Sequence, residues 1–457
     1  MAIRRFRRIT ILSSLLGVFL LYHFLSVRPE LYTRSASQLR TPQSAPDEPP
    51  ECPSLEGIED VLVIMKTGVT EALDKVPIHF QTTLRCVPNY IIFSDFEEEI
   101  EGVKIHDALR TMDSTVRDTV ADFNLYNRLR EQGRAGLESA DFADEANSNI
   151  GKPNNPGWKL DKWKFLPMVQ QALEYKDNAK WYVFMEADTY FSWPTLLEWL
   201  SHLDPKEPHY IGTETQIADV IFAHGGSGFV VSNPAMQLAS NEYASRTIEL
   251  NEYTDWHWAG DCVLGKVLAD AGVPLRYSWP ILQNSNIGEL DEFAKGFYRK
   301  PWCFPAVAFH HLTSREIQDL YEFEKRRRRE VSPSDTPVNQ NTPANTQLSC
   351  FKTDNHVLLH RDVFKELIYP ELSNVRDSWD NLSDEEHPAI TTFHECQVLC
   401  SSSRSCAQFV IRDGICFTGE TPRLGVKNPT ARSGWILSTV EHMMENAPRC
   451  PHPDFGL

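Results

Sequence analysis

Two acids, Glu186 and Asp188, give the clearest chemical signal in the sequence, because they directly follow the apolar run 181–185. Residues two apart on an extended chain point to the same side, so both carboxylates would face one space. Acids at the end of a buried strand are costly unless a cation or a proton-transfer task requires them. A divalent metal with oxygen ligands is the simplest explanation. The alternative is a surface loop with two solvated acids. The tripeptide Glu186-Ala187-Asp188 alone does not decide between a metal site and such a loop.

A glycine-rich segment, Phe222–Ser232, opens onto an apolar run further along the chain. It lacks the Lys-Ser/Thr ending of a P-loop, so a nucleoside-triphosphate hydrolase of that type is not supported. Gly225 and Gly226 either make a tight hairpin or let a ligand approach the backbone closely. Both interpretations stay open.

Asp261 stands at the start of an apolar helical stretch. Two histidines, His310 and His311, directly follow the apolar run 307–309. As a helix N-cap, Asp261 would need no further explanation. As a free carboxylate, it would be a candidate for proton transfer. The histidines add a group that binds transition metals.

Three continuous apolar runs, 61–65, 90–93 and 181–185, predict the strands that position these residues. Such runs are typical of strands covered on both faces, and their alternation with helical stretches from 58 to about 330 predicts an α/β sheet. Ligands bind outside the carboxyl ends of the strands in such sheets. Thr67 and Asp95 follow the first two strands, so we expect them at the same edge as Glu186 and Asp188.

Composition limits the class of protein and its partners. The chain has 457 residues, which is too long for one compact domain. Hydrophobic residues make up 41% of it, which is ample for a core. With 45 basic against 63 acidic residues, the net charge of −18 argues against nucleic acid as the main partner. Six of the ten cysteines lie after residue 349, which indicates a separate, oxidised module.

Taken in order, these segments resemble the fringe-like β1,3-glycosyltransferases of glycosyltransferase family 31, in particular the core 1 galactosyltransferase-like branch and its fungal members. The resemblance covers roughly residues 58–325. It depends on the motifs Lys66-Thr67-Gly68, Phe93-Ser94-Asp95, Trp181–Tyr190, Gly225–Phe229, Gly260–Gly265 and Phe309-His310. It implies an α/β domain of the Rossmann-like GT-A type with a central, mostly parallel sheet. It also implies a UDP-sugar donor, Mn²⁺, inversion at the anomeric carbon and type II topology in the Golgi membrane.

The family motifs assign roles to individual residues. Asp188 matches the last acid of the family's Asp-Asp-Asp-Thr-Tyr motif and His310 its late histidine, so the resemblance makes both metal ligands. Glu186 stands where the first acid would be, which leaves open whether it ligates directly or through water. Asp261 matches the aspartate that takes the proton from the acceptor hydroxyl. His311 is expected to be a packed neighbour.

Contacts to the donor are expected from the strand ends and the glycine loop. Thr67 and Asp95 would contact the nucleoside, and Gly225 and Gly226 would line the donor site. Lys162 either adds positive charge near the diphosphate or is a surface lysine on an amphipathic helix. Trp256 and Trp258 either stack on a sugar acceptor or are part of the hydrophobic core, and both interpretations stay open.

The amino end predicts a membrane anchor. Four arginines within residues 1–8 precede an uncharged apolar run, 9–27, which is long enough to span a bilayer. A cleaved signal peptide is the alternative, but no small-x-small cleavage site follows the run. We therefore expect a cytosolic tail at 1–8, a signal anchor at 9–27 and a Pro- and Ser-rich stem at 28–56 in front of a lumenal catalytic domain, 57–330.

A linker at 331–348 would lead to a disulfide-rich module at 349–457. The spacing of its inner cysteines resembles the PAN/apple domain, a small α+β fold. That resemblance implies three pairs: Cys396–Cys416, Cys400–Cys406 and Cys350–Cys450. A zinc site is the less favoured alternative in an oxidising lumen.

Two further cysteine pairs and one modification are expected elsewhere. The pairs are Cys52–Cys86 and Cys262–Cys303. Asn381, in Asn381-Leu382-Ser383, is the usable N-glycosylation sequon.

Together these observations predict an inverting, metal-dependent transferase. It would move galactose or an N-acetylhexosamine from a UDP-sugar to a hydroxyl of a glycan or glycoprotein in β1,3 linkage. One alternative is a non-catalytic binding protein or chaperone on the same fold, and another is a carbohydrate or protein adhesin that works through its carboxyl-terminal module. Retention of Asp188, Asp261 and His310 favours the enzyme. Ala187 and Gly260 stand where the family has acids, and the loss of these two flanking acids favours the chaperone.

Overall fold

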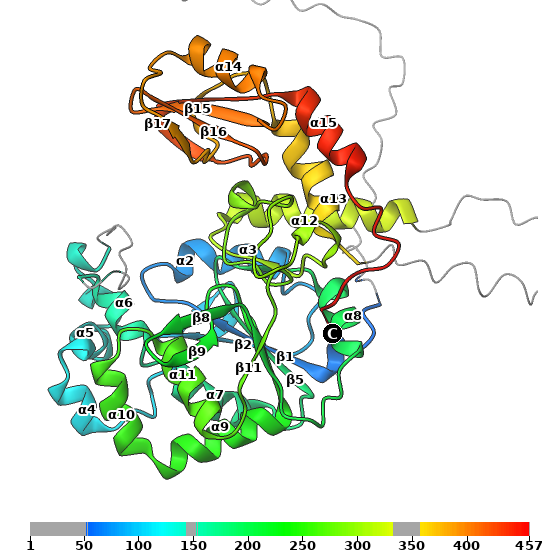
Figure 1. Ribbon diagram of the computed structural model, residues 1–457. Helices are drawn as coiled ribbons and strands as arrows, with labels where there is room; N and C mark the ends of the chain where they lie inside the picture. The colour runs from blue at the N-terminus through cyan, green and yellow to red at the C-terminus, as the bar shows by residue number, and fades with distance from the viewer. Residues whose placement is uncertain (1–51, 53, 143–151, 153, 332–356, 457) are drawn as a thin grey trace, which may run out of the picture. The chain divides into compact units, whose positions relative to one another are not determined.

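The apolar runs predicted as strands lie at the centre of an eight-stranded sheet (Figure 1). The computed structural model describes residues 52, 54–142, 152, 154–331 and 357–456. In it, β1 (Val61–Lys66) pairs in parallel with β2 (Tyr90–Ser94) and β5 (Trp181–Glu186). The strand order is β11-β7-β10-β5-β1-β2-β4-β3, with β3 Glu98–Ile100, β4 Val103–Asp107, β7 Tyr210–Gly212, β10 Phe229–Ser232 and β11 Leu275–Tyr277. Within this sheet, β10 and the edge strand β3 run against their neighbours, so the sheet is mostly parallel, as predicted.

Alternate residues of β1 enter two separate cores. Val63 and Met65 pack on one face of the sheet with α8 (Trp193–Ser201). Leu62 and Ile64 pack on the other face, which three longer helices cover: α7 (Phe165–Tyr175), α9 (Asn233–Ser245) and α11 (Gly260–Asp270). Because both faces are covered, the strand shows a continuous apolar run in place of alternation.

Shorter elements surround this sheet. Two small antiparallel pairs flank it, β6 (Tyr190–Phe191) with β12 (Ala308–Phe309) and β8 (Glu214–Ile217) with β9 (Val220–Ala223). The remaining helices before residue 332 are α2 Ala72–Lys75, α3 Pro77–Gln81, α4 Ser114–Thr119, α5 Asn124–Gln132, α6 Pro156–Asp161, α10 Thr247–Trp256 and α12 Ser314–Val331.

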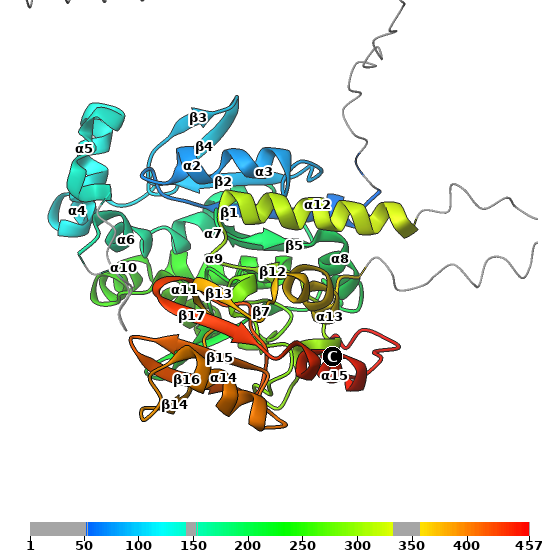
Figure 2. The same cartoon turned by 90° about the horizontal axis from the view of Figure 1, so that it is seen from above.

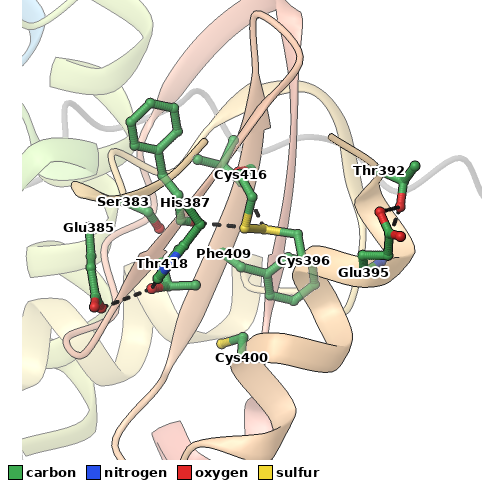
Figure 3. Close-up of a disulfide and its surroundings, with 12 residues drawn as sticks. Ser383, Glu385, His387, Thr392, Glu395, Cys396, Cys400, Phe409, Cys416 and Thr418 are labelled. Carbon is green, nitrogen blue, oxygen red and sulfur yellow. Dashed lines mark hydrogen bonds between the residues drawn. A yellow bond between two sulfur atoms is a disulfide. The ribbon is translucent and has the colours of Figure 1, made fainter. Parts of the chain in front are cut away.

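The carboxyl-terminal region forms a five-stranded antiparallel sheet with one helix, α14 (Phe393–Ser402), against it. Its order is β13-β17-β15-β16-β14, with β13 Arg376–Asp380, β14 Glu385–His387, β15 Gln408–Arg412, β16 Ile415–Gly419 and β17 Val426–Trp435. Thr392 starts α14: its hydroxyl accepts from the Glu395 backbone N–H at 3.3 Å and donates to the Glu395 carboxylate at 2.6 Å (Figure 3). Two further helices, α13 (His360–Val363) and α15 (Leu437–Asn446), flank this sheet in the sequence.

Two disulfides fix α14 to its surroundings, and both are those that the PAN/apple resemblance implies. Cys396 pairs with Cys416 on β16 (Figure 3), and Cys400 pairs with Cys406. A spacing of four residues places both helix cysteines on one face, and their buried sulfurs pack with Phe409. The amino-terminal pair, Cys52–Cys86, is also confirmed.

Two other predicted pairings, Cys350–Cys450 and Cys262–Cys303, are wrong, because Cys303 pairs with Cys450. Cys262 is a free, buried thiol that packs with Phe222. Cys303 follows Trp302, whose indole N–H donates to the Pro448 carbonyl at 3.0 Å, so the two segments lie together. Cys350 lies outside the described residues.

Residues Cys52–Leu457 form one compact unit, and the carboxyl-terminal region shares a core with the α/β region. Trp302 packs in that core with Phe364 and Trp435. A buried side-chain contact reinforces the junction, since His360 Nδ1 lies 3.1 Å from the Glu292 carboxylate and both side chains are almost fully enclosed.

The predicted glycosylation of Asn381 is wrong, because this residue is completely buried. Its amide nitrogen donates to the Phe409 and Gly434 carbonyls at 3.0 and 3.3 Å, and its oxygen accepts from the Ser383 hydroxyl at 2.8 Å. A sugar on that nitrogen would displace these partners from a sheet interior. Asn381 is therefore a structural amide.

The tail and anchor predicted at 1–27, and most of the stem at 28–56, lie outside the described residues, as does nearly all of the linker at 331–348. Among the residues that are described, no helix combines the length and apolar character needed to cross a membrane.

The Cys303–Cys450 pairing can be tested by replacing Cys450 with serine. This disulfide joins residues 147 apart, so its removal should lower the free energy of unfolding by about 3–5 kcal/mol. Thermal unfolding of the full chain measures the loss, with Cys262→Ala as the control that leaves every disulfide intact. Proteolysis without reduction should release Cys303 joined to Cys450, and a fragment joining Cys350 to Cys450 would contradict the structure.

Candidate active site

A cleft of about 530 Å³ lies at the carboxyl ends of β1 and β5. Its lining includes six residues that concern the chemistry: Lys66, Lys162, Glu186, Asp188, Asp261 and His310. This is the edge at which the sequence predicted a ligand site. The structure thus brings the predicted metal ligands and the predicted base into one cleft.

Asp188 and His310 meet because β6 pairs with β12. Tyr190 lies opposite Phe309 in that pair, so the residues just before Tyr190 lie beside those just after Phe309. His310 Nε2 lies 3.2 Å from Asp188 Oδ1, and the Leu312 backbone N–H donates to the Asp188 carbonyl at 3.0 Å. Burial alone would raise the pKa of Asp188, but His310, and after it Lys75, hold that pKa well below its ordinary value.

The residues present fit a divalent transition metal. Among the described residues, Asp188, His310 and His311 each offer a ligand atom within 4.8 Å of the others. Asp188 Oδ2 accepts from Lys75 Nζ at 3.0 Å, whereas its buried Oδ1 faces His310 Nε2. A mixed imidazole and carboxylate set suits Mn²⁺ better than Mg²⁺.

Glu186 lies beside this group and is held by a different partner. Lys66 pairs in register with Glu186 across β1 and β5, and its Nζ lies 3.0 Å from the carboxylate. The nearest approach of Glu186 to His310 Nε2 is 3.9 Å. A role of Glu186 at the metal, direct or through water, stays a prediction.

Asp261 is not the N-cap of α11, so that alternative is wrong. Ala259 occupies the cap position, and Asp261 is the second residue of the helix. Its carboxylate accepts from the Gly225 backbone N–H at 2.8 Å and from the Cys262 N–H at 2.9 Å. Burial is the main reason that the pKa of Asp261 is raised to about 6. A carboxylate with that pKa suits a general base near neutral pH.

Glycines let these groups approach closely. A Cβ at Gly260 would lie 2.5 Å from the Lys162 carbonyl oxygen, so the acid expected from the family does not fit before Asp261. A Cβ at Gly226 would lie 2.0 Å from the His310 ring. Gly226 also accepts from the Thr189 hydroxyl at 2.8 Å, which joins the glycine loop to the end of β5.

The residues predicted to bind the donor have different placements. Lys162 lines the cleft but is nearly buried, and its Nζ lies 2.9 Å from Asp122, so it is not a surface lysine. Thr67 and Asp95 are buried and do not line the cleft. Asp95 accepts from the Val69 backbone N–H at 2.7 Å, so it shapes the loop that follows β1. Direct contacts of Thr67, Asp95, Gly225 and Gly226 with a donor stay predictions.

Sequence reasoning missed a buried charge network under the cleft. Lys66 Nζ lies 2.5 Å from Asp161, and Lys164 Nζ lies 3.2 Å from Asp161 and 3.5 Å from Asp95. Burial opposes the charge on Lys66, yet Asp161 and Glu186 raise its pKa, so the ammonium stays protonated. The sequence signal that could have indicated this network is Lys66, a lysine at the end of an apolar strand.

Two tryptophans form one wall of the cleft. Trp158 and Trp258 are stacked with ring centroids 6.0 Å apart, and both line the cleft. Trp256, the other tryptophan considered from the sequence, is 92% exposed and lies outside the lining.

Comparison with known proteins adds one finding. Residues 161–282 match the family model described as Fringe-like. The matched range includes Asp188, the glycine loop and Asp261. A search of curated proteins gives no match. The Fringe-like family is a family of glycosyltransferases, so the match supports that class for this region.

The packing of Gly226 against His310 can be tested with Gly226→Ala. The added methyl group must displace the imidazole, so we expect Mn²⁺ affinity to fall about tenfold or more. Gly157→Ala is the control in the same cleft, because its Cβ would meet its nearest atom at 3.4 Å. Isothermal titration with Mn²⁺ measures both variants. Unchanged affinity in Gly226→Ala would show that His310 does not depend on this packing.

Proposed function

We propose that this chain is an inverting, metal-dependent glycosyltransferase that acts on a UDP-sugar. The sugar, galactose or an N-acetylhexosamine, would pass to a hydroxyl of a glycan or glycoprotein in β1,3 linkage, as in the core 1 galactosyltransferase-like branch and its fungal members. The Fringe-like match supports the class, and the donor, the linkage and the metal belong to the proposal.

One observation carries the proposal: a single cleft contains side chains that could together hold a metal ion and a separate carboxylate of raised pKa. An inverting transfer needs both. One group must accept the proton of the attacking hydroxyl, and another must stabilise the leaving diphosphate.

The residues then have separable roles. Asp188 and His310 would hold the metal, which when bound neutralises the diphosphate charge. Asp261 would accept the proton of the acceptor hydroxyl, and two backbone N–H groups orient its carboxylate for that task. Lys66 stays charged beneath the cleft and adds positive potential close to the expected diphosphate.

The Trp158–Trp258 wall offers a flat apolar surface of the kind on which sugar rings stack. We assign it to the acceptor side of the cleft, because Trp258 and Asp261 are three residues apart and both line the cleft.

The proposal includes a compartment. Four disulfides among the described residues are typical of an oxidising lumen. With the anchor expected at 9–27, they favour a single-pass type II protein of the Golgi membrane.

The variant Asp261→Asn separates an enzyme from a non-catalytic relative. Asn cannot accept the proton, so turnover should fall by about 10² to 10⁴. Its amide oxygen keeps one of the two backbone hydrogen bonds, so stability should change by about 1 kcal/mol. Transfer from UDP-sugars in the presence of Mn²⁺, UDP titration and thermal unfolding are measured on one preparation.

The outcomes of that experiment are distinct. A stable variant that binds UDP and transfers nothing supports the base role, because the base acts on the acceptor and not on UDP. Transfer at the wild-type rate would leave Asp261 a structural group. A wild-type protein that binds UDP but transfers no sugar to any acceptor would support the chaperone alternative.

A further inference from the structure

His311 has a backbone conformation that is rare for a residue with a side chain. Its φ is +56°, in the left-handed region. Such conformations persist only where the surrounding structure enforces them, and they are concentrated at functional sites. The residue directly follows His310.

The conformation brings two imidazoles to the same side of the chain. Successive side chains of an extended strand point to opposite sides, so His311 would normally face away from His310. Here the two rings are stacked, with centroids 3.8 Å apart and planes 30° apart. A ligand nitrogen of His311 thereby lies within 4.8 Å of ligand atoms of both His310 and Asp188. His311 also lines the cleft.

Glu186, the alternative third ligand, is already engaged. Its carboxylate pairs with the buried ammonium of Lys66 at 3.0 Å. If Glu186 turned to a metal, the buried ammonium of Lys66 would lose one of its two carboxylate partners in the network and keep only Asp161. Asp188 differs, because Lys75 occupies one of its oxygens and the other faces the imidazole of His310, the second proposed ligand.

We propose that Asp188, His310 and His311 together bind one divalent transition-metal ion, with His311 in place of the first acid of the motif. The role of the ion, which is to bind the diphosphate of the donor, rests on the proposed function; the ligand set does not. Two imidazoles and one carboxylate favour Mn²⁺, Co²⁺ or Zn²⁺ over Mg²⁺ and Ca²⁺. Three protein ligands leave coordination positions for phosphate oxygens.

The number of bound imidazoles gives the direct test. The purified full chain is stripped of metal and titrated with Mn²⁺, with and without UDP, and electron spin-echo spectra of the bound Mn²⁺ report the coupled ¹⁴N nuclei. We expect two imidazole nitrogens in the wild-type protein and one in His311→Gln. A wild-type spectrum with a single imidazole nitrogen, or no Mn²⁺ binding in either condition, would overturn the proposal.

Affinities give a second readout with matched variants. His311→Gln should weaken Mn²⁺ binding about tenfold or more and change Mg²⁺ binding little. Glu186→Gln should weaken Mn²⁺ binding less than His311→Gln does. His394→Gln, an exposed histidine on α14, is the control for a general loss of imidazole. The reverse order, with Glu186→Gln the more damaging, would assign the third ligand to Glu186.

This test is independent of catalysis. Two coupled imidazoles in a protein that does not bind UDP would support the metal site and contradict the proposed function. UDP binding with one coupled imidazole would support the proposed function and contradict the three-ligand metal site.

Discussion

The pairing of Lys66 with Glu186 at the ends of β1 and β5 is the constraint on which the rest of the cleft depends. Parallel register places the two residues side by side, and Lys66 is almost fully buried. A buried ammonium must have partners, and removal of one partner of a buried pair costs about 3–5 kcal/mol. Asp161 completes the pairing, and Lys164 extends it to Asp95. One network therefore joins the ends of three strands to α6 and determines which acid remains available for a metal.

The other side of the cleft is held by a segment that also contacts the carboxyl-terminal region. Asn284 approaches His310 Nδ1 at 3.4 Å, and the Ser285 carbonyl accepts from the His310 backbone N–H. A few residues later, Asp291 accepts from the Thr421 hydroxyl at 2.5 Å, and Glu292 pairs with His360. The carboxyl-terminal region thus packs on the same stretch of chain that orients a metal ligand. Within the carboxyl-terminal region, α14 lies beside β15 and β16 (Figure 2).

Much of the sheet could be predicted because it follows from local pattern, whereas the meeting of Asp188 with His310 was implied by the family resemblance. A continuous apolar run identifies a buried strand, and acids after its last residue must lie at the ligand-binding edge. The pairs Cys396–Cys416 and Cys400–Cys406 were implied by the PAN/apple resemblance, and local spacing indicated only that Cys396 and Cys400 share one helix face.

Features that depend on distant contacts were not predictable from pattern. Cys450 pairs with Cys303 because the chain end returns to the α/β region, which no spacing reveals. Asn381 is in a correct sequon, but β-sheet packing buries its amide. A helix cap stayed open as the alternative for Asp261 because the sequence does not show that its carboxylate turns to Gly225. His311 was expected to be a packed neighbour of His310 and does stack on it, but its positive φ is not visible in the sequence.

Anomalous diffraction at the manganese edge, from crystals of the full chain grown with Mn²⁺ and UDP, tests the central claim most directly. The account predicts one manganese peak within coordination distance of Asp188 Oδ1 and His310, with the diphosphate on that ion and Asp261 facing the remaining space of the cleft. No peak at Asp188, or UDP bound outside this cleft, would contradict it.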